Sequence, residues 1–403
     1  MIEISNERIS VLRILIPHPI HIQPPERSPR AVHPVYCLSM NTPRAPRLLL
    51  ILLALLTALL ATPSTAIAQL TPERLYFGVG QRVPVQIDVP EGFVGEVTLH
   101  LYDPATKEWT HKVPAASGRV DLTSLLPHLW ETKPRTVTYA QLELDGVPTG
   151  APLVLQPLVT PNRAVLAEPT TMNLTEDPRT GEVVFEDKRI PALHAQGKRE
   201  SGLREVTFSG FRIYVDQEIV MNTSMGQIVY RLRPDAAPNT AYNFLHLTQG
   251  GFYTNIIFHR IVAKLPNGNP FVIQVGDLSG TGSGGPGYMI DLEDSNLPHD
   301  FGVLSMARDS NPDTNGSQVF VALSREGTSF LDGRYTAFAE AVEGASVIQE
   351  IAAVPVGPED RPLDPPMLLS CTTRNAPPIQ DRLPALSKVE QQVPVQPIGE
   401  PDR

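Results

Sequence analysis

The sequence predicts a mainly β protein made of two β-rich regions joined by a polar segment. In the first region apolar and polar residues alternate, as in VPVQIDV at residues 83–89, which is the period-two pattern of a half-buried strand. In the second region short apolar runs are separated by turn residues, and residues 237–253 and 344–354 carry helical spacing. A chain of 403 residues is also too long for one compact core, so we expect more than one domain.

The first 68 residues predict a targeting segment. From Met40 the sequence contains two arginines, a short apolar run that begins at Leu48, and the small-x-small motif AIA at residues 66–68. These three parts are typical of a signal peptide, so residues 40–68 are expected to be removed and the protein exported to a bacterial periplasm or cell envelope. A signal retained as a membrane anchor is the alternative. Residues 1–39 fit no signal design and are expected to be untranslated or a disordered extension.

Charge and cysteine content limit the possible classes of function. The net charge is −10 for the whole chain and −13 without residues 1–68, which contain six arginines and three glutamates. Nucleic-acid binding requires a basic surface, so we expect no nucleic-acid partner. Only Cys371 follows the signal peptide, and the mature chain is therefore expected to have neither an intramolecular disulfide nor a cysteine-based metal site.

Domain boundaries follow from changes in composition. Residues 69–165 hold several short alternating runs, which predict an antiparallel, immunoglobulin-like β-sandwich; we expect it to be a spacer or to dock to an envelope partner. Residues 166–204 are polar and are expected to be a linker with one added strand at Val183–Phe185. Residues 205–357 form the second domain, and the Pro-rich residues 358–403 are expected to be a disordered or extended tail.

Three stretches of the second domain resemble the cyclophilin family. They are MNTSMGQIVYRLRPDAAPNTAYNFLHLTQGGFYTNIIFHRIV, HDFGVLSMARDSNPDTNGSQVFVAL and SFLDGRYTAFAEAVEG, and they agree with the family in order and spacing. The resemblance implies a closed eight-stranded antiparallel β-barrel capped by two helices, with peptidyl-prolyl cis-trans isomerase activity and no cofactor or metal. It also implies that the partners are proline-containing unfolded or extended polypeptides, whose folding the protein assists.

The same resemblance assigns residues to an active site. Arg260 takes the position of the family's catalytic arginine, and Gln274 that of the residue that holds the substrate carbonyl. An arginine suits the reaction because it stays protonated and presents several donors in one plane, and X-Pro rotation requires no nucleophile. The substrate-binding positions that the resemblance implies are Phe271, Val272, Ala307, Arg308, Asp309, Gln318, Phe320, Phe330, Leu331 and Tyr335.

The sequence departs from the family pattern at several positions. KLPNGNP at residues 264–270 makes the link between the two catalytic positions about six residues longer than usual, and its composition predicts a turn. We expect this turn to protrude at the rim of the groove and to influence client choice. Val275 stands where glycine is common, and Phe330 and Tyr335 where many members have Trp and His. Because these changes affect rate and preference, a prolyl-peptide-binding module or chaperone with little turnover is the alternative function.

Two further patterns suggest other chemistry. GTGSGG at residues 280–285 satisfies the dinucleotide-binding fingerprint, which requires a helix directly after it. Here Pro286 follows, and the next residues show no helical periodicity, so no cofactor is expected. His259 lies next to Arg260 and has the chemistry of a general base. Successive side chains of a strand point to opposite faces, however, and we therefore expect His259 to be a packed, hydrogen-bonded residue.

Overall fold

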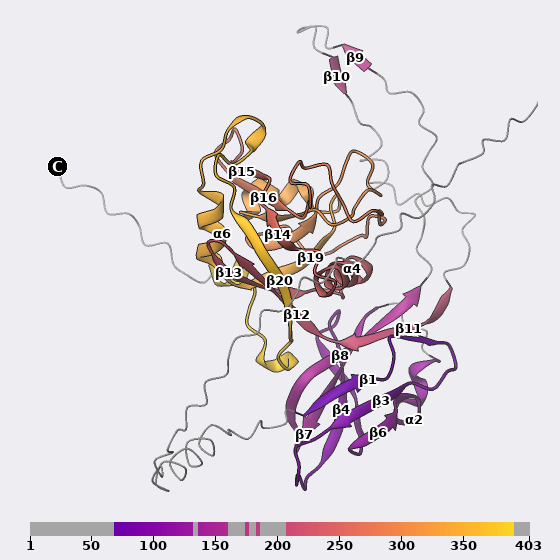
Figure 1. Ribbon diagram of the computed structural model, residues 1–403. Coiled ribbons are helices and arrows are strands. Elements are labelled where there is room, and N and C mark those ends of the chain that lie inside the picture. The colour runs from indigo at the N-terminus through magenta and orange to yellow at the C-terminus, as the bar shows by residue number, and fades with distance from the viewer. Residues whose placement is uncertain (1–67, 132–135, 160–173, 177–182, 186–206, 391–403) are drawn as a thin grey trace, which may run out of the picture. The chain divides into compact units, whose positions relative to one another are not determined.

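The computed structural model describes residues 68–131, 136–159, 174–176, 183–185 and 207–390 (Figure 1). The predicted extension, nearly all of the predicted signal peptide and most of the predicted linker therefore lie outside the described residues. Within the linker, strands β9 (Leu174–Glu176) and β10 (Val183–Phe185) pair antiparallel, so the strand expected at Val183–Phe185 is confirmed. Over the part of the chain that is described, no helix is both long and apolar enough to cross a membrane.

The first β region consists of two antiparallel sheets that contribute to one hydrophobic core (Figure 1). The smaller sheet has the order β1-β3-β6, and it contains β1 (Gln69–Pro72), β3 (Pro84–Asp88) and β6 (Gly118–Asp121). The larger sheet has the order β2-β11-β8-β7-β4-β5, and it contains β2 (Tyr76–Gly78), β4 (Val97–Asp103), β5 (Glu108–Pro114), β7 (Thr138–Leu144), β8 (Val147–Val159) and β11 (Phe208–Val215). An immunoglobulin-like topology stays a prediction.

Strand β11 differs from the predicted domain boundary. Composition places residues 208–215 in the second domain, but β11 pairs along its length with β8 and also with β2, so it belongs to the first region. Its Phe211 and Ile213 are part of the core of that region. The predicted boundary is misplaced because apolar alternation identifies a strand but does not say which sheet the strand joins.

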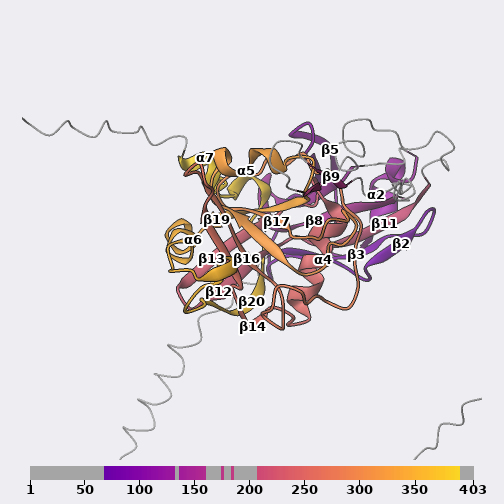
Figure 2. The same cartoon turned by 90° about the horizontal axis from the view of Figure 1, so that it is seen from above.

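The second β region is one nine-stranded antiparallel sheet with the order β14-β20-β12-β13-β19-β17-β18-β16-β15 (Figures 1 and 2). Its strands are β12 (Gln217–Thr223), β13 (Gly226–Leu232), β14 (Thr254–Ile257), β15 (Arg260–Lys264), β16 (Pro270–Val275), β17 (Val303–Met306), β18 (Val319–Ala322), β19 (Ala337–Glu343) and β20 (Met367–Asn375). Only Phe258 and His259 separate the two end strands in sequence. The sheet is curled, and its closure into the eight-stranded barrel implied by the resemblance stays a prediction.

Two helices pack against the core of this sheet, as expected. Helix α4 (Pro238–Gln249) begins with proline at its first position, where no hydrogen bond of the amide is lost. Helix α6 (Ala345–Ala352) follows β19. Their buried residues include Phe244 and Ile348, which belong to the same core as Phe338 of β19. The ring centroids of Phe244 and Phe338 are 5.3 Å apart, so α4 is fixed directly on the sheet.

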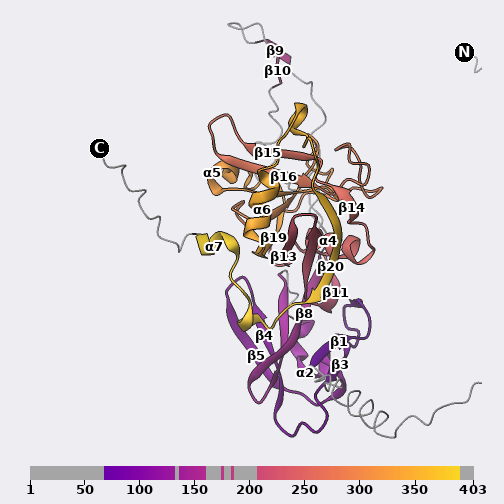
Figure 3. The ribbon, with the colours of Figure 1, turned by 60° about the vertical axis from the view of Figure 1, so that its left-hand side comes forward.

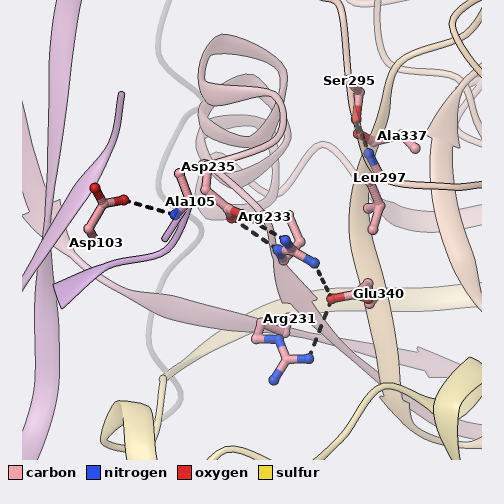
Figure 4. A network of polar contacts seen from close by, with 9 residues as sticks. All are labelled: Asp103, Ala105, Arg231, Arg233, Asp235, Ser295, Leu297, Ala337 and Glu340. Atoms are coloured by element: carbon pink, nitrogen blue, oxygen red, sulfur yellow. Dashed lines mark hydrogen bonds and ion pairs between the residues drawn. The ribbon is translucent and has the colours of Figure 1, made fainter. Parts of the chain in front are cut away.

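Partly buried ion pairs connect the segment before α4 to two strands. Arg233 donates hydrogen bonds to both carboxylate oxygens of Asp235, at 2.9 and 2.7 Å, and to Glu340 of β19 at 2.7 Å (Figure 4). Arg231 of β13 donates to the same Glu340 oxygen at 3.4 Å. Because every charge in this group has an opposite partner, we interpret it as structural.

The predicted tail is partly wrong. Residues 367–375 form β20, which lies between β12 and β14 and contributes Leu368 and Cys371 to the core. Burial raises the pKa of the Cys371 thiol. The sequence hides this strand because prolines lie close to both of its ends, and a Pro-rich composition resembles that of a linker. The remaining described elements are short: α2 (Leu122–Leu125), η1 (Pro127–Leu129), α5 (Arg325–Thr328), η2 (Ser329–Leu331), η3 (Pro358–Asp360), η4 (Ile379–Asp381) and α7 (Leu386–Glu390).

Candidate active site

The two residues expected to be catalytic lie directly opposite each other. Arg260 on β15 is the cross-strand partner of Gln274 on β16, and Gln274 is the partner of Phe320 on β18. Directly opposed residues of adjacent strands project from the same face of a sheet. The sheet therefore brings a guanidinium, a carboxamide and an aromatic ring together on one surface.

An apolar cluster lies beside these polar groups. Val272, Phe320 and Leu331 are buried against one another in a cluster separate from the main core. The rings of Phe320 and Tyr335 meet edge to face, with centroids 5.7 Å apart. Most of the positions expected to bind substrate therefore lie in one apolar site. The partly buried residues packed against this cluster are Val262, Phe271, Ala307 and Tyr335.

The rim of the site carries an aromatic pair and a cation. Phe330 is 50% exposed and stacks on Phe271, with ring centroids 5.8 Å apart. The Arg308 guanidinium lies 4.4 Å from the centroid of the Tyr335 ring and donates a 2.7 Å hydrogen bond to the carbonyl of Asp309. Arg308 is therefore fixed at the edge of the cluster, with the exposed Asp309 next to it.

Gln318 connects the sheet to the glycine-rich loop. Its amide nitrogen donates to the carbonyls of Gly282 and Gly284, at 2.9 and 2.8 Å. The loop folds around the carboxylate of Asp277, which accepts hydrogen bonds from the backbone amides of Ser279 and Gly282, each at 2.7 Å. Burial by itself raises the pKa of Asp277, but the hydrogen bond from the Ser279 hydroxyl, together with those from the backbone amides of the loop, holds it well below its usual range. The GTGSGG motif thus forms a turn around Asp277 in place of a helix start.

His259 is buried and hydrogen-bonded to the Gln318 side chain, as expected, but within the described part of the chain only one of its ring nitrogens has a partner. The residue is 4% exposed, and its Nδ1 has no hydrogen-bond partner among the described residues. Burial lowers the pKa of His259, and the nearby Asp277 offsets this only in part. Because His259 is buried, its ring has no access to a substrate, so the general-base alternative has no support.

A second polar cluster lies beneath the apolar site, and sequence reasoning did not find it. His299 Nδ1 is 3.0 Å from Asp332 Oδ1, and its Nε2 is 2.9 Å from Ser305 Oγ. The arrangement resembles that of a serine nucleophile with its base, but His299 and Ser305 are both 0% exposed. The His299 ring stacks on Phe320 with centroids 5.7 Å apart. It therefore supports the floor of the apolar site and has no access to a substrate.

The predicted turn at residues 264–270 is confirmed as the end of the β15–β16 hairpin. We call its residues 265–269 the hairpin turn. The amide of Leu265 donates to the carbonyl of Asn269 at 2.8 Å, and the ladder continues to the Lys264–Pro270 pair. The Asn269 side chain donates to the carbonyl of Glu326 in α5 at 3.3 Å. An influence of this turn on client choice stays a prediction.

A second loop borders the site from the other side of Arg260. Residues 355–363, which we call the strap, follow α6 and contain η3 (Figures 1 and 3). Arg361 of the strap donates to the carbonyls of Gly280 and Thr281, at 2.6 and 3.2 Å. Asp360 accepts a 3.2 Å hydrogen bond from Arg260 Nη2. Sequence reasoning missed these contacts because it placed most of the strap in the tail.

Comparisons with known proteins agree with this geometry. Residues 218–373 match the model of the cyclophilin type peptidyl-prolyl cis-trans isomerase family. The chain is 45% identical over 152 residues to peptidyl-prolyl cis-trans isomerase-like 1 of Aspergillus fumigatus, a match that covers 36% of this chain and 89% of the relative. It is 38% identical over 152 residues to peptidyl-prolyl cis-trans isomerase ppi1 of Schizosaccharomyces pombe, a match that covers 36% of this chain and 92% of the relative. The chain belongs to the cyclophilin family of peptidyl-prolyl cis-trans isomerases.

A solved structure is also similar. It is the crystal structure of a cyclophilin type peptidyl-prolyl cis-trans isomerase of Cryptosporidium parvum in the presence of the dipeptide Ala-Pro. The two chains are 31% identical, the TM-score is 0.36, and the match covers 40% of this chain and 99% of the other. The family match begins at residue 218, so the first β region lies outside it.

The predicted location in a bacterial periplasm or cell envelope is wrong. The relatives named above, at 45% and 38% identity, come from fungi, and a bacterial relative from Staphylococcus aureus is less similar, at 34% identity over 176 residues. The stronger similarity is therefore to eukaryotic proteins, in conflict with a bacterial envelope protein. The location rested on the signal peptide predicted at residues 40–68, which lies outside the described residues apart from Ala68.

Proposed function

We propose that this isomerase accelerates X-Pro rotation in unfolded or extended polypeptides and thereby assists their folding, with Arg260 as the catalytic donor. The observation that carries this proposal is the placement of Arg260 opposite Gln274, on the face that holds Phe320. The substrate proline would enter the apolar cluster, and its preceding carbonyl would meet the Gln274 carboxamide. The segment at Ala307 would contact the residues before the proline.

The chemistry of rotation explains why a single donor is enough. The peptide C–N bond has partial double-bond character, which gives a barrier of about 18–20 kcal/mol. When the bond twists, resonance is lost and the lone pair of the prolyl nitrogen becomes an acceptor. A guanidinium N–H that donates to this lone pair binds the twisted state better than either planar isomer, and only such differential binding raises the rate. Each tenfold acceleration requires about 1.4 kcal/mol of it.

The alternative is a prolyl-peptide-binding module or chaperone with little turnover. The departures from the family pattern favour this alternative function. Val275, however, is fully buried in the main core and is absent from the apolar cluster at the site. The substitution of a glycine by Val275 thus gives no steric reason for slow turnover. Phe330 and Tyr335 keep an aromatic ring at each of the two other positions.

A protease-coupled assay on an Ala-Pro peptide tests the proposal. We expect the Arg260→Ala variant to lose roughly 10²-fold in kcat/KM, the size of effect seen when one preorganised transition-state donor is removed. Arg119→Ala is the control, because Arg119 pairs with Glu73 in the first β region; its rate should equal that of the wild type. Equal rates for the wild type and Arg260→Ala would contradict the proposal. Peptide binding by the wild type without turnover would support the binding module.

A further inference from the structure

We propose that Asp360 is a positioning residue that holds the Arg260 guanidinium in the orientation used for catalysis. This inference rests on the proposed function, because it assumes that Arg260 acts on the substrate. It assigns a role in the reaction to the strap, which contains none of the residues placed at the site by resemblance.

The contact leaves Arg260 free to act. Asp360 Oδ2 accepts from Nη2 at 3.2 Å, and the side chains of Arg260 and Asp360 are 41% and 42% exposed. A guanidinium has five N–H donors in one plane. One bond to a carboxylate therefore restricts the plane of the group while other N–H donors remain available to a substrate. Without a partner, a long arginine side chain at the end strand of the sheet would sample many rotamers.

The strap is strained beside Asp360. Glu359 and Asp360 have φ angles of 59° and 58°, in the left-handed region, which Asp adopts more readily than Glu, so the unfavourable conformation lies mainly at Glu359. The loop closes on itself through a 2.7 Å hydrogen bond from the Gly357 amide to the Arg361 carbonyl. Such strain persists only where the surroundings over-determine the conformation, and it is concentrated at functional sites. In the strap, the contacts of Asp360 with Arg260 and of Arg361 with Gly280 hold this conformation in place.

The strap also connects two parts of the groove. Arg361 binds the carbonyls of Gly280 and Thr281, and the same glycine-rich loop is bound by Gln318 through Gly282. Asp360 binds Arg260 while its neighbour in the chain binds the loop. A shift of the strap would therefore move the carboxylate relative to the guanidinium, and the hydrogen bonds of Arg361 prevent this shift.

The test removes the charge and leaves the turn. Asparagine, like aspartate, adopts the left-handed conformation more readily than most residues, so Asp360→Asn keeps the strap and loses only the ion pair. Asp360→Ala loses the charge and the acceptor, and it also weakens the left-handed turn, so Asp360→Asn is the cleaner variant. We expect kcat to fall about two- to fivefold in Asp360→Ala, the factor that corresponds to the free energy of an exposed ion pair, with KM unchanged and Asp360→Asn in between. Glu359→Gln is the matched control, since the structure records no partner of Glu359 among the described residues, and its kcat should equal that of the wild type.

Two readouts separate positioning from a structural effect. High salt screens an exposed ion pair, so kcat of the wild type should fall towards that of Asp360→Ala as ionic strength rises, while the variant stays constant. In an Arg260→Ala background, Asp360→Ala should have no further effect. An equal loss in both backgrounds would overturn the inference, as would a faster Asp360→Ala enzyme, which would make Asp360 a competitor for the guanidinium.

The same double-mutant cycle distinguishes this inference from the proposed function. If Arg260→Ala retains the wild-type rate, the proposed function fails. If Arg260→Ala is slow and Asp360→Ala matches the wild type, only the positioning role of Asp360 fails.

Discussion

Two loops border the candidate site, and they differ in what they bind. The hairpin turn of residues 265–269 bonds to itself and to α5, through neutral groups. The strap of residues 355–363 carries charged side chains that bind Arg260 and the glycine-rich loop. The hairpin turn contains the insertion that stands out in the sequence, whereas the strap lies in a stretch that resembles a tail. An unusually long loop in the sequence is therefore not necessarily the loop that contacts the catalytic residue.

The difference follows from how each loop leaves the sheet. The hairpin turn extends a ladder that already exists between β15 and β16, so its backbone groups find partners locally. The strap connects α6 to β20 and passes beside β15, so its residues meet groups from distant parts of the chain. Arg361 and Gly280 are 81 residues apart, and Asp360 and Arg260 are 100 residues apart.

The largest effect is expected where the hairpin meets α5. A Cβ atom at Gly327 would lie 1.8 Å from the carbonyl oxygen of Pro270, a backbone atom that cannot move without shifting β16. We expect Gly327→Ala to lower the free energy of unfolding by about 1–3 kcal/mol, as other overpacked substitutions do. Denaturation with urea measures it. Gly285→Ala is the control, because a Cβ atom there would meet no atom within 4 Å, and equal stability of both variants would contradict the close contact.

A smaller effect is expected at the anchor of the strap. Arg361→Ala removes the hydrogen bonds to Gly280 and Thr281, so Asp360 should be held less firmly against Arg260. We expect kcat/KM to fall about two- to fivefold, the same range as for loss of the exposed ion pair itself. The peptide assay measures this, with Arg334→Ala as an exposed control of equal charge change. A wild-type rate in Arg361→Ala would show that the strap needs no anchor.

The parts of the site that could be predicted lie on continuous motifs. FHRIV and FVIQV each specify a strand, and the resemblance was enough to place Arg260, Gln274 and Phe320 together. The hairpin turn was also predicted, because Pro, Gly and Asn adopt turn conformations for local reasons. These features depend on short stretches of sequence, which is why sequence alone identifies them.

The parts that could not be predicted depend on distant contacts. Strand β11 pairs with β8, and β20 lies between β12 and β14. Each of these strands could pair with several strand edges, and the local sequence does not specify which one. The cluster of His299, Ser305 and Asp332 joins a loop and a strand to a residue 33 positions away from His299. No sequence pattern predicts that these three side chains meet. The contact of Asp360 with Arg260 depends likewise on the path of the strap, which no local pattern specifies.

The smallest effect is expected from shortening the hairpin turn, and this measurement tests most directly whether the strap or the hairpin serves Arg260. Residues 265–269 are replaced by Asn-Gly, which favours a two-residue hairpin and keeps the Lys264–Pro270 pair. Its kcat/KM on an Ala-Pro peptide is compared with that of Asp360→Ala. We expect the shortened variant to stay within about twofold of the wild type and Asp360→Ala to fall further, as an exposed ion pair predicts. A larger loss in the shortened variant than in Asp360→Ala would contradict the role of the strap.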